Sequence, residues 1–514
     1  MSFEVKKEKV RIDKTLSQQS PQVMVDCDVI VPDRKSDVLK VLQVDAGISI
    51  TSRELREGIV SIGGKIDYAI LYLSEDANTV ESILISQPYN HMEEIVQAGP
   101  GMHCFVDSDI SHVEFSLVNS RKIAIKTIAD LSIDVIDKME IDVMSEIEDE
   151  GLQYKTTAFK AVETLVGVNR KISVSDRLSV PSGKQTIDEI LKFDVAIYNR
   201  DVKIINNKVI VKGDVVVNTL YVPEEDGGIT YMEHSVPFTE ILDVEGIDES
   251  LRSDVRLRVC DKSLGVAADD DNDKRVLEMS VTIDVDIRAS RIDNVQAVSD
   301  CYAVGGEIET ANKYMEVDQI SDVVSIAHTL RDIVKFADDI PRATHIYNVI
   351  AKPYVTSALV EGGRIILEGT LDTYVLYISE NADSPVYTYK YELPFTISED
   401  AAGSDSASST VQARLQLEHL SFNINAAGEV EVRAFVSGKA EVGSVSGINV
   451  VCEITQSEVE TAEYPSLVMC FVEKDENLWD IAKHYRVRQS DIMQANKMET
   501  QTLQEGTGLI IPTK

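Results

Sequence analysis

The chain has 514 residues and carries 50 basic against 87 acidic side chains, for a formal net charge of −37. At about 150 residues per domain this length predicts three or four domains, and a hydrophobic content of 44% is ordinary for a folded protein. A polyanion of this size is repelled by nucleic acids and by acidic membrane surfaces, so the composition excludes both as general partners.

The N-terminal segment shows no targeting signal. Its lysines, Lys6, Lys7 and Lys9, are not followed by the apolar core of a secretory signal peptide. No apolar stretch of the chain approaches the ~20 residues needed to cross a bilayer. Six cysteines without a Cys-x-x-Cys pair argue against a disulfide framework or a structural zinc site. We therefore expect a protein of a reducing cytosol.

One pattern recurs three times upstream of residue 458. Each copy opens at a proline, continues into a strand-like run with a glycine eight residues before the tyrosine of a Leu-Tyr pair, and then reaches a proline followed by an aromatic residue. The three copies hold, in this order, Pro32, Gly64, Tyr72 and Tyr89; Pro181, Gly213, Tyr221 and Phe238; Pro341, Gly369, Tyr377 and Phe395. The tyrosines of the Leu-Tyr pairs are 149 and then 156 residues apart.

The apolar residues of each copy alternate with a period of two, as in residues 208–217 and 429–436, and many are β-branched. Turn-forming pairs such as Asn206-Asn207 separate these runs. We predict a mainly β protein made of three tandem antiparallel, sandwich-like domains, each of which buries its own sheet face. The shared glycine is expected to permit a bulge or close packing, and the aromatic residue after the proline is expected to plug the core.

The expected organisation has an N-terminal extension (1–20), three repeats (21–150, 151–300 and 301–457), a linker (458–466) and a small C-terminal module (467–514). The charge is uneven along these parts. Residues 473–514 hold 6 basic and 7 acidic side chains, which gives 6 − 7 = −1, so nearly all of the excess lies upstream. The C-terminal module is therefore the surface that repels a docking partner least.

The C-terminal module changes to a helical period. Leu478, Ile481, Ala482 and Tyr485 lie at i, i+3, i+4 and i+7 and form one apolar helix face. Asn477 stands directly before this face, where asparagine is a favoured N-cap residue. Short strands are expected over residues 470–472 and 509–511, so the module is predicted to be a compact βααβ unit.

A search for catalytic, cofactor-binding or metal motifs finds none that is complete. Residues 269–273 match the start of a calcium-binding EF-hand loop, but Lys274 replaces the required glycine and Ser280 replaces the bidentate glutamate. His103 and Cys104 could form a nucleophile pair or hold a metal ion, yet their spacing to other ligands matches no such site. We expect no enzyme activity, no cofactor and no metal ion.

Two resemblances to known families follow from these residues. The order Leu478-Trp479, Asp491-Ile492, Asn496 and Leu509-Ile510-Ile511-Pro512 resembles the LysM module, a small βααβ unit that binds glycans or proteins. The threefold Gly-x(7)-Tyr and Pro-aromatic pattern resembles the SPOCS domain of spore-forming Firmicutes. Tandem SPOCS domains followed by a LysM module are similar to the SipL-type spore-coat morphogenetic family, a functional counterpart of the SpoVID group.

This resemblance implies no catalysis. It implies a mother-cell cytoplasmic protein at the outer forespore surface, in the basal coat layer. There it would bind SpoIVA, the polymerising ATPase of the coat basement, mainly through the LysM module, and couple coat assembly to that layer; other coat proteins are further expected partners. Carried onto this chain, the candidate partner-binding residues are Asp475, Glu476, Asn477, Leu478, Trp479, Ile481 and Asn496.

Trp479, the sole tryptophan of the chain, is the expected hot spot, because an exposed tryptophan commonly anchors interfaces. Packing beside the start of the helix is its alternative role. The LysM family usually has Gly-Asp-Thr at the lip of its N-acetylglucosamine groove, where this chain has Asp475, Glu476 and Asn477. Aspartate tolerates a left-handed backbone, so the turn can survive, but two added carboxylates change the chemistry of the lip.

Two other functions stay open. The runner-up is a peptidoglycan- or cortex-binding protein that acts through the LysM module; the acidic lip and the lack of a signal peptide argue against it. The third is a hydrolase that the LysM module targets to its substrate. A hydrolase would need a catalytic set of carboxylate or Cys/His residues upstream, and the three repeats offer none.

Overall fold

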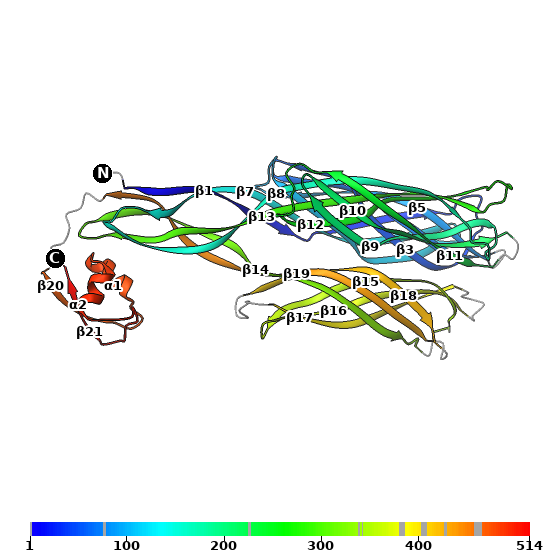
Figure 1. Ribbon diagram of the computed structural model, residues 1–514. Coiled ribbons are helices and arrows are strands. Elements are labelled where there is room, and N and C mark those ends of the chain that lie inside the picture. The colour runs from blue at the N-terminus through cyan, green and yellow to red at the C-terminus, as the bar shows by residue number, and fades with distance from the viewer. Residues whose placement is uncertain are drawn as a thin grey trace.

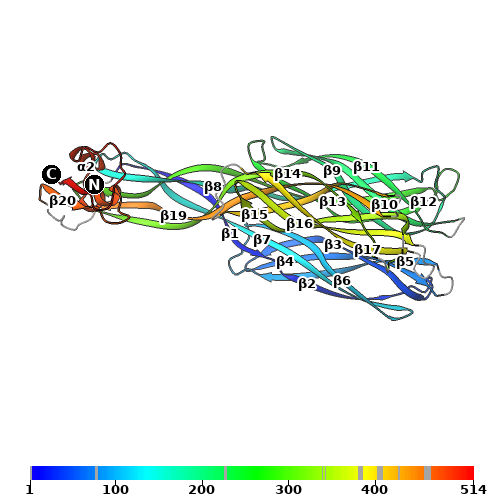
Figure 2. The same ribbon diagram turned by 90° about the horizontal axis from the view of Figure 1, so that it is seen from below.

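The computed structural model describes residues 3–75, 79–224, 228–337, 340–341, 343–379, 386–401, 409–425, 429–456 and 465–513. Figures 1 and 2 show an elongated molecule with three parts. A head of three β-sandwiches forms one end, a narrower stalk of long strands extends from it, and a small C-terminal module lies at the tip of the stalk. The two described helices belong to this module, and neither is long and apolar enough to span a membrane.

Each repeat contains two packed antiparallel sheets, as the sequence predicts. We call them the axial sheet and the stalk sheet, after the part of the molecule that each one enters. The axial sheets consist of β3 (Val38–Arg56), β4 (Ile59–Ser74) and β5 (Val80–Glu94); β9 (Ile187–Ile205), β10 (Lys208–Pro223) and β11 (Thr230–Asp243); and β15 (Ala343–Glu361), β16 (Arg364–Ser379) and β17 (Val386–Asp400).

The stalk sheets are built around strands that run on past the sandwiches. Their members are β1 (Val5–Gln19), β2 (Gln22–Ile30), β6 (His103–Asn119) and β7 (Lys122–Ile147); β8 (Leu152–Ser179), β12 (Arg252–Ala267) and β13 (Val276–Ala303); and β14 (Ile308–Val334), β18 (Thr410–Ile424) and β19 (Val430–Gln456). Strand pairing thus groups residues 5–147, 152–303 and 308–456 into three units.

Residues 1–20, which we set apart as an extension, do not stand apart from the first repeat. Residues 5–19 form β1, which pairs along β7 from Val5–Ile147 to Gln19–Ile133. The pairing supplies partners for the backbone amides and carbonyls of β1, which an isolated extended segment would have to leave to water. Of the expected linker, residues 458–466, the part from 458 to 464 lies outside the described residues.

Three two-stranded ribbons, β1–β7, β8–β13 and β14–β19, form the stalk. Each of the six strands sends two alternate side chains into one buried core: Val10 and Ile12, Ile141 and Val143, Phe159 and Ala161, Val295 and Ala297, Met315 and Val317, and Ile448 and Val450. Alternation along each strand turns the intervening residues toward solvent. The stalk therefore has a hydrophobic core of its own, separate from those of the three sandwiches.

The signature residues of the repeat have one structural role in all three copies. Tyr72, Tyr221 and Tyr377 are fully buried, and each hydroxyl lies within hydrogen-bond distance of the backbone carbonyl 36 positions earlier, at 3.3, 3.2 and 2.8 Å. The Tyr72 hydroxyl shares its single proton between this carbonyl and the carboxylate of Glu81, which is 2.9 Å away. These carbonyls lie in the loop that opens each axial sheet. The tyrosine thereby fixes that loop to its own sandwich.

The shared glycine pairs across the sheet with the aromatic residue that follows the proline. The pairs in register are Gly64 with Tyr89, Gly213 with Phe238, and Gly369 with Phe395. A β-carbon on any of these glycines would press into the opposite ring. A register shift also lies beside each glycine on the neighbouring strand pair, so the structure confirms both the close packing and the bulge.

The leucines of the Leu-Tyr pairs point away from the tyrosines, into a cluster that the three repeats share. Leu71, Leu220 and Leu376 belong to this cluster, and the residues opposite them in register are Gln43, Lys192 and Asn348, which are all buried. The three axial sheets therefore meet around a pseudo-threefold axis, and the head is one body rather than three separate beads.

Polar contacts tie the axial sheets to one another. Lys192 of the second repeat pairs with Asp45 of the first and, at 3.1 Å, with Asp194 of its own strand. Asn348 of the third repeat donates to Asp194 at 3.2 Å. Burial alone would lower the pKa of Lys192, but the carboxylates of Asp194 and Asp45 outweigh it and raise that pKa.

Candidate binding site in the C-terminal module

The C-terminal module is a βααβ unit, as predicted. It comprises β20 (Leu467–Phe471), α1 (Leu478–Tyr485), α2 (Gln489–Ala495) and β21 (Gly508–Pro512). The strands are antiparallel and each is two residues longer than the sequence indicates, and Pro512 pairs with Leu467 at the end of the ladder. The predicted apolar helix face packs into the module's core, where Leu478, Ile481 and Ala482 are buried.

The loop between β20 and α1 keeps the LysM-like turn in spite of its changed residues. Asp475 adopts a left-handed backbone with φ of 63°, a conformation that aspartate tolerates better than most residues. Asn477 is the N-cap of α1, as predicted: its side-chain oxygen accepts from the backbone amide of Asp480 at 3.0 Å. Glu476 accepts from the amide of Glu473 at 3.0 Å, so its carboxylate closes the loop on itself.

Asn496 connects α2 to β21. Its side-chain amide donates to the carbonyls of Ile492 and Ile510 at 2.8 and 2.6 Å, and its oxygen accepts from the amide of Ile510 at 2.7 Å. These three bonds use the donors and the acceptor of the amide within the module. The sequence analysis places Asn496 among the partner-binding residues, and the structure gives it a role in the module's own fold.

Trp479 does not stand free at the surface. Its indole nitrogen donates to Asp300 of β13 at 2.8 Å, and its ring meets that of Tyr302 edge-to-face with centroids 5.0 Å apart. The ammonium of Lys155 lies 5.5 Å from the centroid of the Trp479 ring. Trp479 is therefore half-buried against the stalk rather than fully exposed, and Leu478 and Ile481 face the module's core. The partner-binding role of these three residues stays a prediction.

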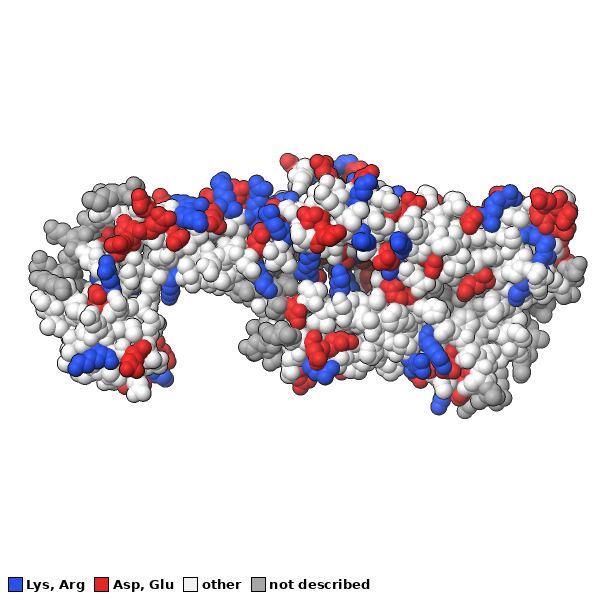
Figure 3. Space-filling model, viewed as in Figure 1, with Lys and Arg blue, Asp and Glu red and all other residues white. Residues whose placement is uncertain are grey.

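Basic residues of the module complete this contact with the tip of the stalk. Lys483 pairs with Asp300 at 2.6 Å, and Arg486 pairs with Glu307 at 2.6 Å. Arg488 donates to the carbonyl of Glu150 at 3.2 Å. Figure 3 shows acidic side chains gathered on the stalk beside the module, so the charges of the two surfaces are complementary.

The outer face of the two-stranded sheet is apolar and open to solvent. We call it the apolar strip; Leu467, Met469 and Phe471 of β20 are 64, 65 and 64% exposed, and Ile510 of β21 is 38% exposed. An apolar cluster of this kind marks interaction sites more often than it is left bare. The sequence analysis missed it, although alternation over residues 467–471 was the available signal. Of the seven predicted site residues, Asp475, Glu476 and Asn477 lie nearest to β20 in the chain, on the loop that follows it.

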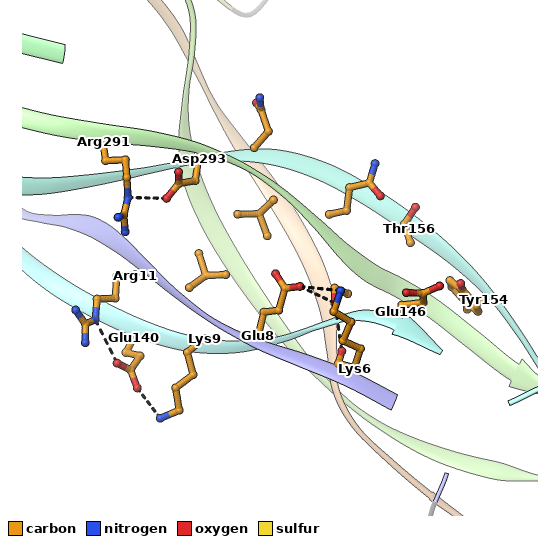
Figure 4. A pocket seen from close by; sticks show the side chains of 15 residues that line it. Lys6, Glu8, Lys9, Arg11, Glu140, Glu146, Tyr154, Thr156, Arg291 and Asp293 are labelled. Carbon is orange, nitrogen blue, oxygen red and sulfur yellow. Dashed lines mark hydrogen bonds and ion pairs between the residues drawn. The ribbon is translucent and has the colours of Figure 1, made fainter. Parts of the chain in front are cut away.

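A hollow lies in the stalk, between the β1–β7 and β8–β13 ribbons (Figure 4). It has a volume of about 850 Å³ and is lined mainly by polar residues. The basic side chains in it are already paired: Lys6 with Glu8, Lys9 and Arg11 with Glu140, and Arg291 with Asp293. Paired charges of this kind leave little to attract an ionic ligand, so we do not regard the hollow as the functional site.

The residues that raised the question of catalysis or metal binding have structural surroundings. Among the described residues, no group of three or more His, Cys, Asp or Glu side chains is arranged to hold a metal ion. Asp269 accepts from the amides of Asp271 and Asp273 at 3.0 and 2.9 Å, which makes residues 269–273 a turn closed on itself. Burial raises the pKa of the Cys104 thiol to about 11, so little of it is the reactive thiolate at neutral pH.

Comparison with known protein families identifies both kinds of domain. Residues 37–118, 186–266 and 342–425 match the family described as SipL, SPOCS domain. Residues 472–512 match the LysM domain. No curated protein and no solved structure matches the chain. The three SPOCS matches cover the strands from β3, β9 and β15 to β6, β12 and β18, so the long strands of the stalk lie outside them.

Proposed function

Because this chain belongs to the SipL-type family, with three SPOCS domains ahead of a C-terminal LysM domain, we propose that it is a non-enzymatic adaptor of spore-coat assembly. It binds SpoIVA, the polymerising ATPase of the coat basement, through the LysM module. It acts in the mother cell at the outer surface of the forespore. Nucleotide hydrolysis in this assembly belongs to the partner rather than to this chain.

The position of the LysM module carries the proposal. The module lies at the tip of the stalk, at the far end from the SPOCS head (Figure 1). One part of the chain can therefore contact the basement layer while the head reaches components above it. A partner that forms a lattice presents many copies of one site, so avidity can compensate for a small contact on each module.

The apolar strip is the surface that we assign to this contact. Leu467, Met469 and Phe471 are each more than half exposed, and the α1 face with Trp479 is already covered by the stalk. Apolar and aromatic side chains at the centre of an interface contribute most of its binding energy. Asp475, Glu476 and Asn477, on the adjoining loop, are proposed to border the contact.

Binding of the full-length chain to two immobilised targets, purified SpoIVA and insoluble peptidoglycan, tests the proposal. We expect retention on SpoIVA and a loss of at least about tenfold in affinity for a double variant with Met469→Ser and Phe471→Ser, since each replaced side chain contributes on the order of 1 kcal/mol or more. The control is Val96→Ser, because Val96 is a 92% exposed apolar residue of the head.

Peptidoglycan binding is the second candidate, since LysM modules are glycan-binding units and this one has an exposed loop at the expected lip. Asp475 and Glu476 argue against it, because they stand where the LysM family usually has Gly-Asp, and the added carboxylates change the hydrogen-bonding chemistry of the lip. The double variant Asp475→Gly with Glu476→Asp restores the family's usual residues and should strengthen any binding to peptidoglycan. Binding of the chain to peptidoglycan and not to SpoIVA would replace the adaptor proposal with a glycan-binding function.

A further inference from the structure

We infer that the tip of the stalk is an internal docking surface for the LysM module, and that Trp479 is the positioning residue that holds the module there. The inference concerns how this chain presents its own domain. It rests on contacts within the chain, so it stands whether or not the proposed partner is correct.

Ten residues lie between the end of β19 at Gln456 and the start of β20 at Leu467. A chain of ten residues spans at most about 33 Å, so its length limits the distance between the two parts and does not define their relative orientation. The contacts between the module and the tip of the stalk define that orientation.

The apolar part of the docking contact reaches into the module's own core. Tyr302 is only 4% exposed and belongs to the same cluster as Leu478, Ile481 and Ile492. Its hydroxyl donates to the carbonyl of Val487 at 2.9 Å. A stalk residue thus satisfies the backbone of the turn between α1 and α2, and undocking would expose both its ring and that carbonyl to water.

The polar part of the docking contact is directional. Asp300 receives the indole N–H of Trp479 at 2.8 Å and the ammonium of Lys483 at 2.6 Å, one on each carboxylate oxygen. Gly305 of the β13–β14 turn donates to the carbonyl of Arg486 at 2.9 Å. The two faces of the contact are therefore fixed in orientation, because each bond has a defined donor and acceptor.

Docking also divides the charge of the module. Three of its six basic residues, Lys483, Arg486 and Arg488, contact the tip of the stalk. The seven acidic residues of the segment are not among these contacts. The module therefore turns its basic side inward and presents a more acidic surface, together with the apolar strip, to the outside.

Fluorescence of the single tryptophan reports docking directly, in the full-length chain and without a partner. In the wild type, Trp479 should emit at short wavelength and be protected from acrylamide. Reversing either charge of the Arg486–Glu307 pair, with Glu307→Arg or Arg486→Glu, places like charges together and should shift the docking equilibrium by about tenfold or more. Emission should then move toward that of tryptophan in water, with stronger quenching.

Combining both reversals restores an opposite-charge pair and should restore the wild-type emission. Glu309→Arg is the matched control, since Glu309 is an exposed residue of β14, two positions after Glu307, and it should change neither readout. Water-like emission in the wild type, unchanged emission in both single variants, or failure of the double variant to recover would each overturn the inference.

Discussion

Tyr72, Tyr221 and Tyr377 show how one side chain can fix a loop that lies far from it in the chain. Each hydroxyl lies within hydrogen-bond distance of a backbone carbonyl 36 positions earlier, and each ring is fully buried in its own sandwich. The adjacent leucines face the shared axis instead. Each Leu-Tyr pair therefore joins two cores, because successive residues of a strand face opposite sides.

Replacing Tyr221 with Phe tests the loop contact at one copy. The carbonyl of Gln185 would lose the hydrogen bond from the Tyr221 hydroxyl, so we expect the free energy of unfolding to fall by about 1–2 kcal/mol. Thermal denaturation followed by circular dichroism measures this as a lower midpoint. Tyr314→Phe is the control, because Tyr314 is 63% exposed; an equal fall in both variants would contradict the assigned role.

The glycines of the signature should differ in their tolerance of a methyl group. A β-carbon on Gly369 would overlap the carbonyl oxygen of Tyr354 and lie 2.6 Å from the Phe395 ring, whereas on Gly213 its nearest neighbour would be 3.0 Å away. We expect Gly369→Ala to destabilise by roughly 3 kcal/mol and Gly213→Ala by about 1 kcal/mol, since overpacking costs grow with the shift required. Equal melting temperatures for the two variants would refute this ranking.

Asp300 gives the docking contact a defined dependence on pH. Burial raises the pKa of its carboxyl, but the bonds from Lys483 and Trp479 outweigh this and hold it below the ordinary value of 3.8. A carboxylate with a lowered pKa contributes fully above that ordinary value and loses its contribution as the pH falls through the lowered pKa. Trp479 emission should therefore be constant near neutral pH and shift only below about pH 4. The Asp300→Asn variant should show a smaller acid transition than the wild type.

At the scale of elements, the sequence shows where strands form and how their side chains alternate, but it does not show which strands pair with each other. Period-two runs predict the strands of the three sandwiches, and the glycine and the aromatic residue of the signature are found facing each other. The stalk is different: residues 1–20 are expected to be an extension, because the partner of β1, strand β7, lies about 130 residues away, beyond any local pattern. The same limit applies to Trp479, whose contacts Asp300 and Tyr302 come from the second repeat.

The axial sheets depend on one buried cation where they meet. Replacing Lys192 with Met would leave Asp45 and Asp194 facing each other without a positive charge, so we expect a loss of about 3 kcal/mol in stability. Lys212→Met, on the exposed side of β10, is the control and should change little. Thermal denaturation distinguishes the two, and a Lys192→Met variant as stable as the control would show that the axial leucines suffice.

At the scale of the whole molecule, three similar repeats form a pseudo-symmetric head and stalk, whereas the tip of the stalk carries a single module and is not symmetric. Six strands enter the stalk, but a single LysM module occupies its tip, held by the β13–β14 turn and neighbouring residues. The repeats could be found from the sequence, since their signature is local. Their assembly around one axis could not, because it depends on side chains such as Gln43, Lys192 and Asn348, which are unlike one another and meet only in the fold.

The length of the stalk can change only in fixed increments, because its strands alternate their side chains between core and solvent. A paired strand rises about 3.4 Å per residue and alternates its faces, so β1, with 15 residues, extends roughly 50 Å. Removing one residue from a strand would turn its core side chains outward; only steps of two residues, about 7 Å, keep them inside. All six strands must change together. The separation between whatever the head holds and whatever the module touches is therefore set in whole steps by the sequence.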